Sequence, residues 1–373
     1  MKKKYILWFS EVEIGDVPLV GGKNASLGEM INNLGKKINI PDGFATTSFF
    51  YWRFLEKTKV KDKISEILKS LDSKNIKDLK EKGKRVRNLI LQTEFPKDLE
   101  KEVINAYRKL CQKYKTKNLD VAVRSSATAE DLPGASFAGQ QESFLNIKGE
   151  KQLLIAVKRC IASLFTDRAI SYREDMGFDH LKIALSVGVQ KMVRSDLACS
   201  GVMFSCDTET GFPDVVLINA SYGLGENIVK GRVDPDQYYV FETTLKKGFS
   251  PIIEKKIGSK KIKLVYDKKG GTKNVKVEKE NQQKFCLTDE EILTLAKWSC
   301  LIEDHYKQPM DIEWAKDGKD KKLYILQARP ETVVSKRKID FLENYVLEKK
   351  GKILLEGLAI GSKIGQGKVR VIK

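Results

Sequence analysis

Apolar residues recur with two different periods along the chain and predict a mixture of helices and strands. Helical spacing, with an apolar residue at every third or fourth position, occurs in the first half at residues 64–71, 99–114 and 153–164. Residues 183–239 instead carry short apolar runs separated by Gly, Asp and Pro, which is typical of strands and turns. We therefore expect an α+β fold of two lobes.

The region after residue 280 gives the clearest local signals. Thr288-x-x-Glu291 is a capping box and predicts a helix that continues to about Tyr306. Two short strands are expected at 310–314 and 323–328, joined by the polar turn 316–322.

Three further segments read as connections or as the start of another unit. Residues 246–280 are rich in Lys and Gly and predict one or two exposed hairpins. Residues 335–338 read as a linker. Residues 357–372 are β-like sequence punctuated by glycine, and we expect a further domain to begin there.

The formal net charge of +18 invites a nucleic-acid-binding interpretation. However, 55 of the 68 basic residues are Lys and only 13 are Arg, and the lysines are spread along the chain beside Glu and Asp. Nucleic-acid recognition usually relies on clustered Arg. A general Lys bias or a thermophilic surface explains the charge more simply, and the basic field can still attract a polyanion such as ATP.

Cysteine usage and hydropathy point to a cytoplasmic protein without a structural metal. The six cysteines form no C-x-x-C pair, and only His180 and His305 are available as imidazole ligands. No apolar run approaches the roughly 18 residues that span a bilayer. The apolar start of the chain is short and is followed at once by acidic residues, so we interpret it as a first strand rather than a signal peptide.

A glycine pair followed by lysine is the first segment with candidate chemistry. In Gly21-Gly22-Lys23 the glycines can present N–H groups to a phosphate and Lys23 adds a mobile positive charge. Asn24 or Ser26 could cap a helix whose N-terminus faces the same anion. The alternative is a tight turn before a helix with an ordinary surface lysine.

A strand that ends in arginine is the second such segment. Residues 121–128 place Arg124 before small hydroxyl residues, and its guanidinium is suited to bridging phosphate oxygens. The loop that follows has little bulk and much backbone freedom, and it can fold over a nucleotide through Gly134, Gly139 and Gln140. The alternative is a disordered surface loop.

Two more segments can border a base or ribose. The apolar strand that contains Gln190, Lys191, Met192 and Val193 offers a flat surface for adenine, although in isolation it reads as a core strand. Glu226 follows a glycine turn and can touch ribose or metal, with a plain turn as the alternative.

The two strands near residues 310–329 carry the densest polar pattern. Side chains two apart share a face of a strand, so Asp311 and Glu313 point one way, and Gln327 and Arg329 share the face that Leu323 and Ile325 begin. If the strands pair, Glu313, Gln327 and Arg329 converge. Carboxylate and amide oxygens suit Mg²⁺, and a neighbouring Arg neutralises a phosphoryl group. The alternative is a surface salt bridge between Glu313 and Arg329.

A phosphoryl-accepting histidine is expected on a mobile, glycine-rich or helix-start loop. Neither His180 nor His305 has that setting, so both are expected to be structural.

Seven strings, in order and with little interruption, resemble the N-terminal region of phosphoenolpyruvate synthases (pyruvate, water dikinases). They are VGGKNASLGEM, VAVRSSATAEDLPGASFAGQQESFLN, LFTDRAISYRE, VQKMVRSDLACSGVMFS, GLGENIVKGRVDPDQYY, QPMDIEWAKDG and LQARPETV. The similarity covers residues 5 to 372. Pyruvate, phosphate dikinases, glucan water dikinases and rifampicin phosphotransferases share the architecture.

The resemblance implies an ATP-grasp fold that holds ATP and Mg²⁺ between two lobes. Residues 1–190 would form the N-terminal lobe, 191–335 the C-terminal lobe, and 336–373 a linker with the opening strands of a swivelling domain. By resemblance, Lys23 and Arg124 hold phosphates, Gln190 to Val193 border adenine, and Arg329 contacts the terminal phosphates. Glu313 and Gln327 would coordinate Mg²⁺, and Arg124 and Arg329 would be the catalytic arginines.

The family's histidine motif and pyruvate-binding barrel do not occur in these residues. In the whole enzyme a histidine on the swivelling domain carries the phosphoryl group to pyruvate for gluconeogenesis, and a homodimer is expected. We expect this chain alone to bind ATP, to form no phosphoenolpyruvate, and to have neither nucleic-acid nor membrane partners. The alternatives are another dikinase, an antibiotic phosphotransferase, a stand-alone nucleotide-binding or regulatory subunit, and a basic nucleic-acid-binding protein.

Overall fold

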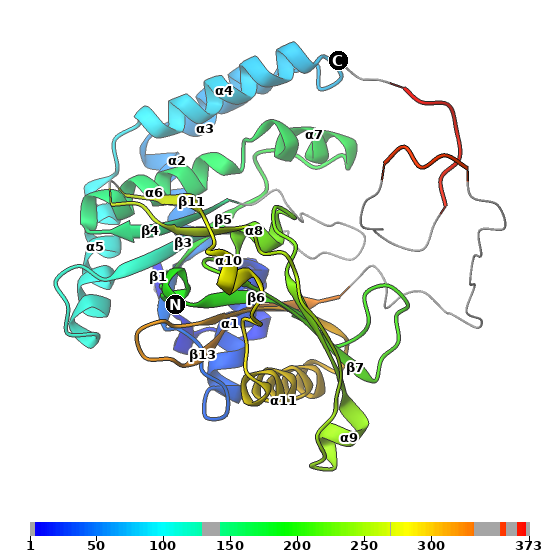
Figure 1. The fold of residues 1–373 in the computed structure, drawn as a ribbon. Helices are drawn as coiled ribbons and strands as arrows, with labels where there is room; N and C mark the ends of the chain where they lie inside the picture. Colours follow the sequence, from blue (N-terminus) through cyan, green and yellow to red (C-terminus); the bar gives the residue numbers. More distant parts are fainter. Residues whose placement is uncertain (1–3, 129–141, 269, 332–350, 356–363, 371–373) are drawn as a thin grey trace.

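The computed structural model describes residues 4–128, 142–268, 270–331, 351–355 and 364–370 (Figure 1). Its helices are α1 (Val17–Leu34), α2 (Ser48–Lys57), α3 (Val60–Leu68), α4 (Ile76–Gln92), α5 (Lys97–Lys113), α6 (Glu150–Ser163), α7 (Asp167–Asp175), α8 (Glu226–Val229), α9 (Glu242–Lys246), α10 (Lys279–Gln282) and α11 (Asp289–Tyr306). Its strands are β1 (Ile6–Trp8), β2 (Gly43–Thr46), β3 (Asp120–Ala127), β4 (Ser143–Lys148), β5 (Leu185–Lys191), β6 (Cys199–Phe204), β7 (Val215–Tyr222), β8 (Asp236–Phe241), β9 (Ile252–Lys256), β10 (Ile262–Tyr266), β11 (Thr272–Lys276), β12 (Met310–Lys316) and β13 (Leu323–Pro330).

The first sheet has five strands in the order β1-β2-β5-β3-β4, and all its pairings are antiparallel. The helices α2 to α7 gather on its side of the molecule (Figure 1). Their apolar faces meet the sheet in one core, where Phe54, Val123, Leu153 and Val189 are fully buried. Burial of side chains of this size stabilises the core by about 1.5–3 kcal/mol each.

The second sheet has six strands in the order β13-β12-β6-β7-β8-β9, again antiparallel. Its core is covered by α11 and includes Ile292, Ile312 and Trp314, all fully buried. The same core takes in Leu7 of β1 and several apolar residues of α1, and α1 also contacts β3 and β5 of the first sheet. The two antiparallel sheets and their helices make the fold α+β, as expected.

Several sequence predictions are confirmed, with small shifts at the ends. The capping box is formed, since Glu291 N donates to Thr288 Oγ1 (3.3 Å) and Thr288 N donates to Glu291 Oε2 (3.1 Å), and α11 ends at Tyr306. The helix expected over 64–71 ends at Leu68 as α3, so Leu71 lies beyond it.

The lysine- and glycine-rich region forms a hairpin, as predicted. β10 and β11 pair with each other, while β9 joins the edge of the second sheet. Leu224 N donates to Leu264 O (2.9 Å), which fastens this hairpin beside the end of β7.

The prediction of strands near the C-terminal end is not met where the chain is described. Residues 351–355 and 364–370 lie outside any helix or strand. A strand needs a hydrogen-bonded neighbour, and no described strand pairs with these residues. The linker expected at 335–338 lies outside the described residues, and the domain boundaries at 190 and 335 stay predictions.

None of the described helices is both long and apolar enough to cross a bilayer.

A β-bulge corrects the predicted faces of β13. Strict alternation would place Gln327 and Arg329 on the face of Leu323 and Ile325. The register instead shifts beside Glu313, so that Trp314 pairs with Ile325, Glu313 pairs with Gln327, and Leu326 is the extra residue. A bulge reverses the faces of the residues after it. Ile325 therefore stays in the core while Gln327 and Arg329 share a face with Glu313.

Candidate functional site

A cavity of about 350 Å³ opens where the two sheets approach each other. The middle of β3, the start of β4 and the end of β5 line it from the first sheet. The turn before α8 and the strands β12 and β13 line it from the second. The lining residues are Ala122, Arg124, Glu142, Ser143, Leu145, Gln190, Lys191, Met192, Val193, Ser195, Leu224, Gly225, Glu226, Val229, Lys230, Glu313 and Leu326.

Part of the lining of this cavity is apolar. Ala122, Met192 and Leu224 are buried, and they form a small cluster with Leu264 that Leu145 and Tyr266 extend. The cluster is separate from the cores of the two sheets and is assembled from both of them and from the β10–β11 hairpin. Flat apolar walls of this kind suit an aromatic ring system.

Other lining residues are charged, and Arg124 and Glu313 lie close together among them. Arg124 Nη2 lies 4.0 Å from Glu313 Oε2, and Arg124 Nη1 donates to Leu326 O (3.4 Å). The Arg124 side chain is only 16% exposed, and its Nε is buried without a hydrogen-bond partner. The carbonyl that holds Arg124 belongs to the bulged residue of β13, so the bulge places a backbone acceptor at the cavity wall. A guanidinium with so few hydrogen-bond partners is available to bind an anionic ligand.

The predicted border residues all reach this cavity. Gln190, Lys191, Met192 and Val193 line it from the end of β5, and Glu226 lines it from the start of α8. The ammonium of Lys191 also lies over the rings of Tyr114 (5.2 Å) and Tyr324 (5.7 Å). Glu226 forms an ion pair with Lys230.

A second, smaller cavity of about 220 Å³ contains two more of the predicted residues. Lys23 and Arg329 line it together with Ser26 and Tyr306. Burial raises the pKa of the Cys160 thiol, Glu142 raises it further and Lys23 lowers it.

Arg329 forms an ion pair with Asp311, whereas the alternative considered from the sequence was a salt bridge with Glu313. Its Nε and Nη2 donate to Asp311 Oδ2 at 2.9 and 2.7 Å. Burial raises the pKa of Asp311, and the Arg329 charge lowers it in part. Asp311 sits two residues before Glu313 on β12, so the two carboxylates follow each other at about 7 Å along one face.

The two strands pair, as the sequence predicted, and the bulge places Gln327 directly opposite Glu313. Gln327 is 7% exposed and lines neither cavity. The predicted Glu313, Gln327 and Arg329 thus share one face of two paired strands, while Arg124 meets them from the first sheet.

The glycine-lysine segment packs against the end of β3. Gly21 interrupts α1 with φ +74°, and a Cβ there would lie 2.3 Å from Ser126 Oγ and 2.6 Å from Ser126 O. Only glycine tolerates both the left-handed backbone and this approach. The close contact brings the turn that carries Lys23 next to the strand that carries Arg124.

The expected capping role of Asn24 and Ser26 is wrong. Asn24 Nδ2 donates to Val20 O (3.0 Å) and to Ser186 Oγ (2.9 Å), and Ser26 Oγ donates to Ala328 O (2.7 Å). Their side chains fasten α1 to β5 and β13 rather than satisfying N–H groups at a helix start.

The two histidines hold ordinary side-chain contacts. His180 Nδ1 accepts from Arg173 Nε (2.9 Å), and His180 Nε2 lies 2.7 Å from Glu174. His305 Nε2 lies 2.8 Å from Glu29 Oε1. Gly134, Gly139 and Gln140 lie outside the described residues.

Sequence reasoning predicted Met192 but missed two other apolar residues of the cavity, Leu145 and Leu224. Leu145 and Leu224 are single apolar residues in strand-like or turn-like segments, and nothing in their spacing marks them as ligand-facing. They meet only because β4 and the turn after β7 converge in the folded chain.

A comparison with protein families decides the relationship of this chain. Residues 17–346 match the family described as pyruvate phosphate dikinase, AMP/ATP-binding domain. The chain belongs to this family.

Comparison with curated proteins agrees. The chain is 54% identical to a phosphoenolpyruvate synthase of Synechocystis sp. over 99% of this chain and 47% of that protein. It is 54% identical to one of Aquifex aeolicus (99% and 45%) and 50% identical to one of Escherichia coli (98% and 46%). The chain spans about half the length of these relatives and corresponds to their N-terminal AMP/ATP-binding part.

Proposed function

We propose that this chain binds Mg·ATP in the first cavity, with adenine at its apolar end and the phosphates towards Arg124 and Glu313. One observation carries the proposal. A single cavity is lined both by apolar residues, including Met192 and Leu224, and by an incompletely satisfied guanidinium beside a carboxylate. This polarity matches a nucleotide, which has an apolar ring system and a polyanionic tail.

The charged strands continue from the first cavity towards the second. Asp311 and Glu313 follow each other along β12, and Arg329 and Lys23 line the second cavity. Lys23 and Arg329 would therefore hold the terminal phosphate, and Arg124 the β-phosphate, which AMP lacks. Positive charge placed along the chain of phosphates stabilises charge that moves during transfer.

The donor set on β12 and β13 fits Mg²⁺. Among the described residues, no group of three or more His, Cys, Asp and Glu could hold a metal. Glu313 and Gln327 supply two hard oxygens, which suits an ion that keeps several waters and binds through phosphates. Mg²⁺ bound there would neutralise phosphate oxygens.

The family supplies the wider proposal. The chain would be the ATP-grasp module of a cytoplasmic, homodimeric phosphoenolpyruvate synthase, with lobes over 1–190 and 191–335. The whole enzyme would convert ATP, pyruvate and water to AMP, phosphoenolpyruvate and phosphate through a histidine on a swivelling domain. The relatives' names favour pyruvate over another dikinase or antibiotic acceptor.

Calorimetric titration with ATP and Mg²⁺ tests the proposal. We expect binding with a Kd below about 1 mM, equivalent to more than about 4 kcal/mol. Glu313→Gln should raise the Mg²⁺ concentration for half-maximal binding by about tenfold, because it removes a charged oxygen ligand. Glu254→Gln, on the exposed edge strand β9, is the matched control and should change nothing. Absence of binding at millimolar ATP, or an unchanged metal requirement in Glu313→Gln, would refute the corresponding assignment.

A further inference from the structure

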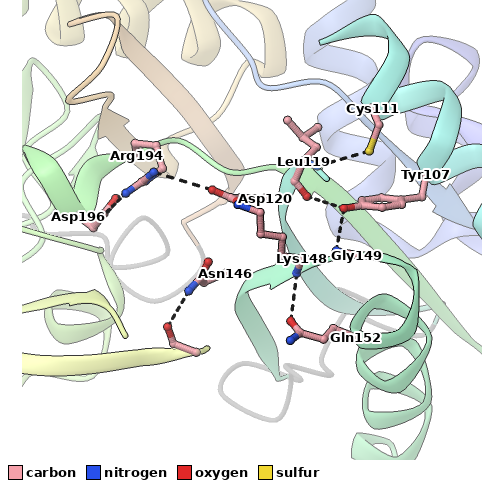
Figure 2. A network of polar contacts seen from close by, with 11 residues as sticks. Tyr107, Cys111, Leu119, Asp120, Asn146, Lys148, Gly149, Gln152, Arg194 and Asp196 are labelled. Atoms are coloured by element: carbon pink, nitrogen blue, oxygen red, sulfur yellow. Dashed lines mark hydrogen bonds and ion pairs between the residues drawn. The ribbon is translucent and has the colours of Figure 1, made fainter. Parts of the chain in front are cut away.

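Arg194 follows the cavity-lining Val193 directly and occupies a junction between the two sheets. Figure 2 shows its guanidinium between Asp120 of β3 and Asp196. Nε and Nη2 donate to the two carboxylate oxygens of Asp196 at 2.8 and 2.9 Å, and Nη1 lies 3.9 Å from Asp120 Oδ2. The side chain is 20% exposed. The bidentate ion pair with Asp196, with the Asp120 carboxylate nearby, fixes the plane of the guanidinium.

Arg194 also contacts the β10–β11 hairpin and the β12–β13 turn, which lie beside the cavity. Its guanidinium carbon lies 4.4 Å from the ring centroid of Tyr266, a member of the apolar cluster on the β10–β11 hairpin. Its N donates to Asp317 Oδ2 (3.1 Å), and its O accepts from Gly318 N (3.0 Å). Asp317 and Gly318 lie in the turn between β12 and β13, the strands that carry Glu313 and Gln327.

Asp120, which meets Arg194 from the first sheet, is itself held firmly. Its carboxylate lies 3.2 Å from Lys148 Nζ, and its carbonyl accepts from Met192 N (3.0 Å). Next to it, Tyr107 Oη donates to Leu119 O (2.8 Å) and accepts from Gly149 N (2.9 Å), which joins α5 to the start of β3 and the end of β4 (Figure 2). Asp120 is therefore a rigid anchor point.

We propose that Arg194 is a positioning residue that sets the geometry of the base-binding end of the cavity. It connects three parts of the chain to Asp120, namely residues 192–195, the β10–β11 hairpin through Tyr266, and the β12–β13 turn. The inference rests on the proposed nucleotide function and adds a residue that does not touch the cavity. Asp196 raises the pKa of Arg194, with smaller contributions from Tyr266 and Asp120, so the guanidinium stays charged. Lysine would keep the charge but lose the fork and the planar stack on Tyr266.

Affinities for ATP, AMP and inorganic tripolyphosphate separate this role from a purely stabilising one. Arg194→Met should weaken ATP and AMP by the same factor, about tenfold, because both carry the base. Tripolyphosphate affinity should stay within about twofold, and Arg194→Lys should recover only part of the loss. All Kd values are measured below the melting temperature of each variant.

Arg87→Met is the matched control. The Arg87 side chain is 27% exposed, and its Nη1 donates to Asp167 Oδ1 (2.7 Å) and to Phe165 O (2.8 Å). None of these three residues lines the first cavity. This variant should lower the melting temperature and leave ATP affinity unchanged. Should Arg194→Met not fold, Asp120→Asn weakens the pair with the first sheet and keeps the Asp196 pair, with an expected threefold loss for both nucleotides.

ATP and AMP affinities that stay at wild-type values in Arg194→Met, or in Asp120→Asn where the first variant does not fold, would overturn the positioning role. A loss for ATP alone would overturn it too, since it would place Arg194 at the phosphate end. Wild-type protein that binds no ATP is a different outcome, because it refutes the nucleotide function itself.

Discussion

Replacement of Arg124 by Met should weaken binding of Mg·ATP by about 100-fold and binding of AMP by no more than about threefold. The Arg124 guanidinium faces the cavity, is mostly buried, and has one nitrogen without a partner. Charge-assisted hydrogen bonds contribute about 1.5–3 kcal/mol each, and 1.4 kcal/mol is a factor of ten. ATP has more phosphate oxygens within reach of this side chain than AMP has, so the loss should fall on ATP.

Fluorescence or calorimetric titration of both nucleotides measures the difference. Arg124→Lys should recover part of the ATP affinity, since it keeps the charge without the fork. Arg53→Met, which breaks a partly exposed pair with Asp98 away from the cavity, is the control and should bind both nucleotides as the wild type does. Equal losses for ATP and AMP in Arg124→Met would contradict a phosphate role for Arg124.

The largest expected effect on stability is at a buried ion pair in the second sheet. Lys260 and Asp236 form an ion pair with both side chains fully buried. The Asp236 carboxylate also accepts from Gly258 N (2.9 Å), Cys286 N (2.8 Å) and Tyr238 Oη (3.2 Å). Lys260 thereby positions the residues that lead into β10, and with them the β10–β11 hairpin beside the cavity.

Lys260→Met should lower the free energy of unfolding by about 3–5 kcal/mol, because it leaves the Asp236 charge buried without its cation. Urea denaturation measures the loss. Lys255→Met breaks an exposed pair with Asp289 (2.9 Å) on β9 and should change stability by less than about 1 kcal/mol. A loss below about 1 kcal/mol in Lys260→Met would show that the second sheet does not depend on the pair.

Local sequence signals predicted the parts of this fold that depend on local physics. The Thr288–Glu291 capping box is satisfied within four residues, and it formed as expected. The antiparallel pairing of β12 with β13 follows from two short strands joined by a polar turn, and it too is present.

The rest depends on contacts between distant segments. The bulge at Leu326 leaves no mark in the pattern of β13, yet it turns Gln327 and Arg329 away from the core. The partner of Arg329 is Asp311 rather than Glu313, a choice made by register. Arg194 lies in a short polar string, and only the folded chain brings Asp120 and Tyr266 to it.

A crystal structure with a non-hydrolysable ATP analogue and Mg²⁺ tests the central claim most directly. The account predicts adenine among Leu145, Met192 and Leu224, phosphates at Arg124, and Mg²⁺ at Glu313 and Gln327. A nucleotide bound elsewhere, or bound in this cavity with its phosphates at the apolar end, would contradict it.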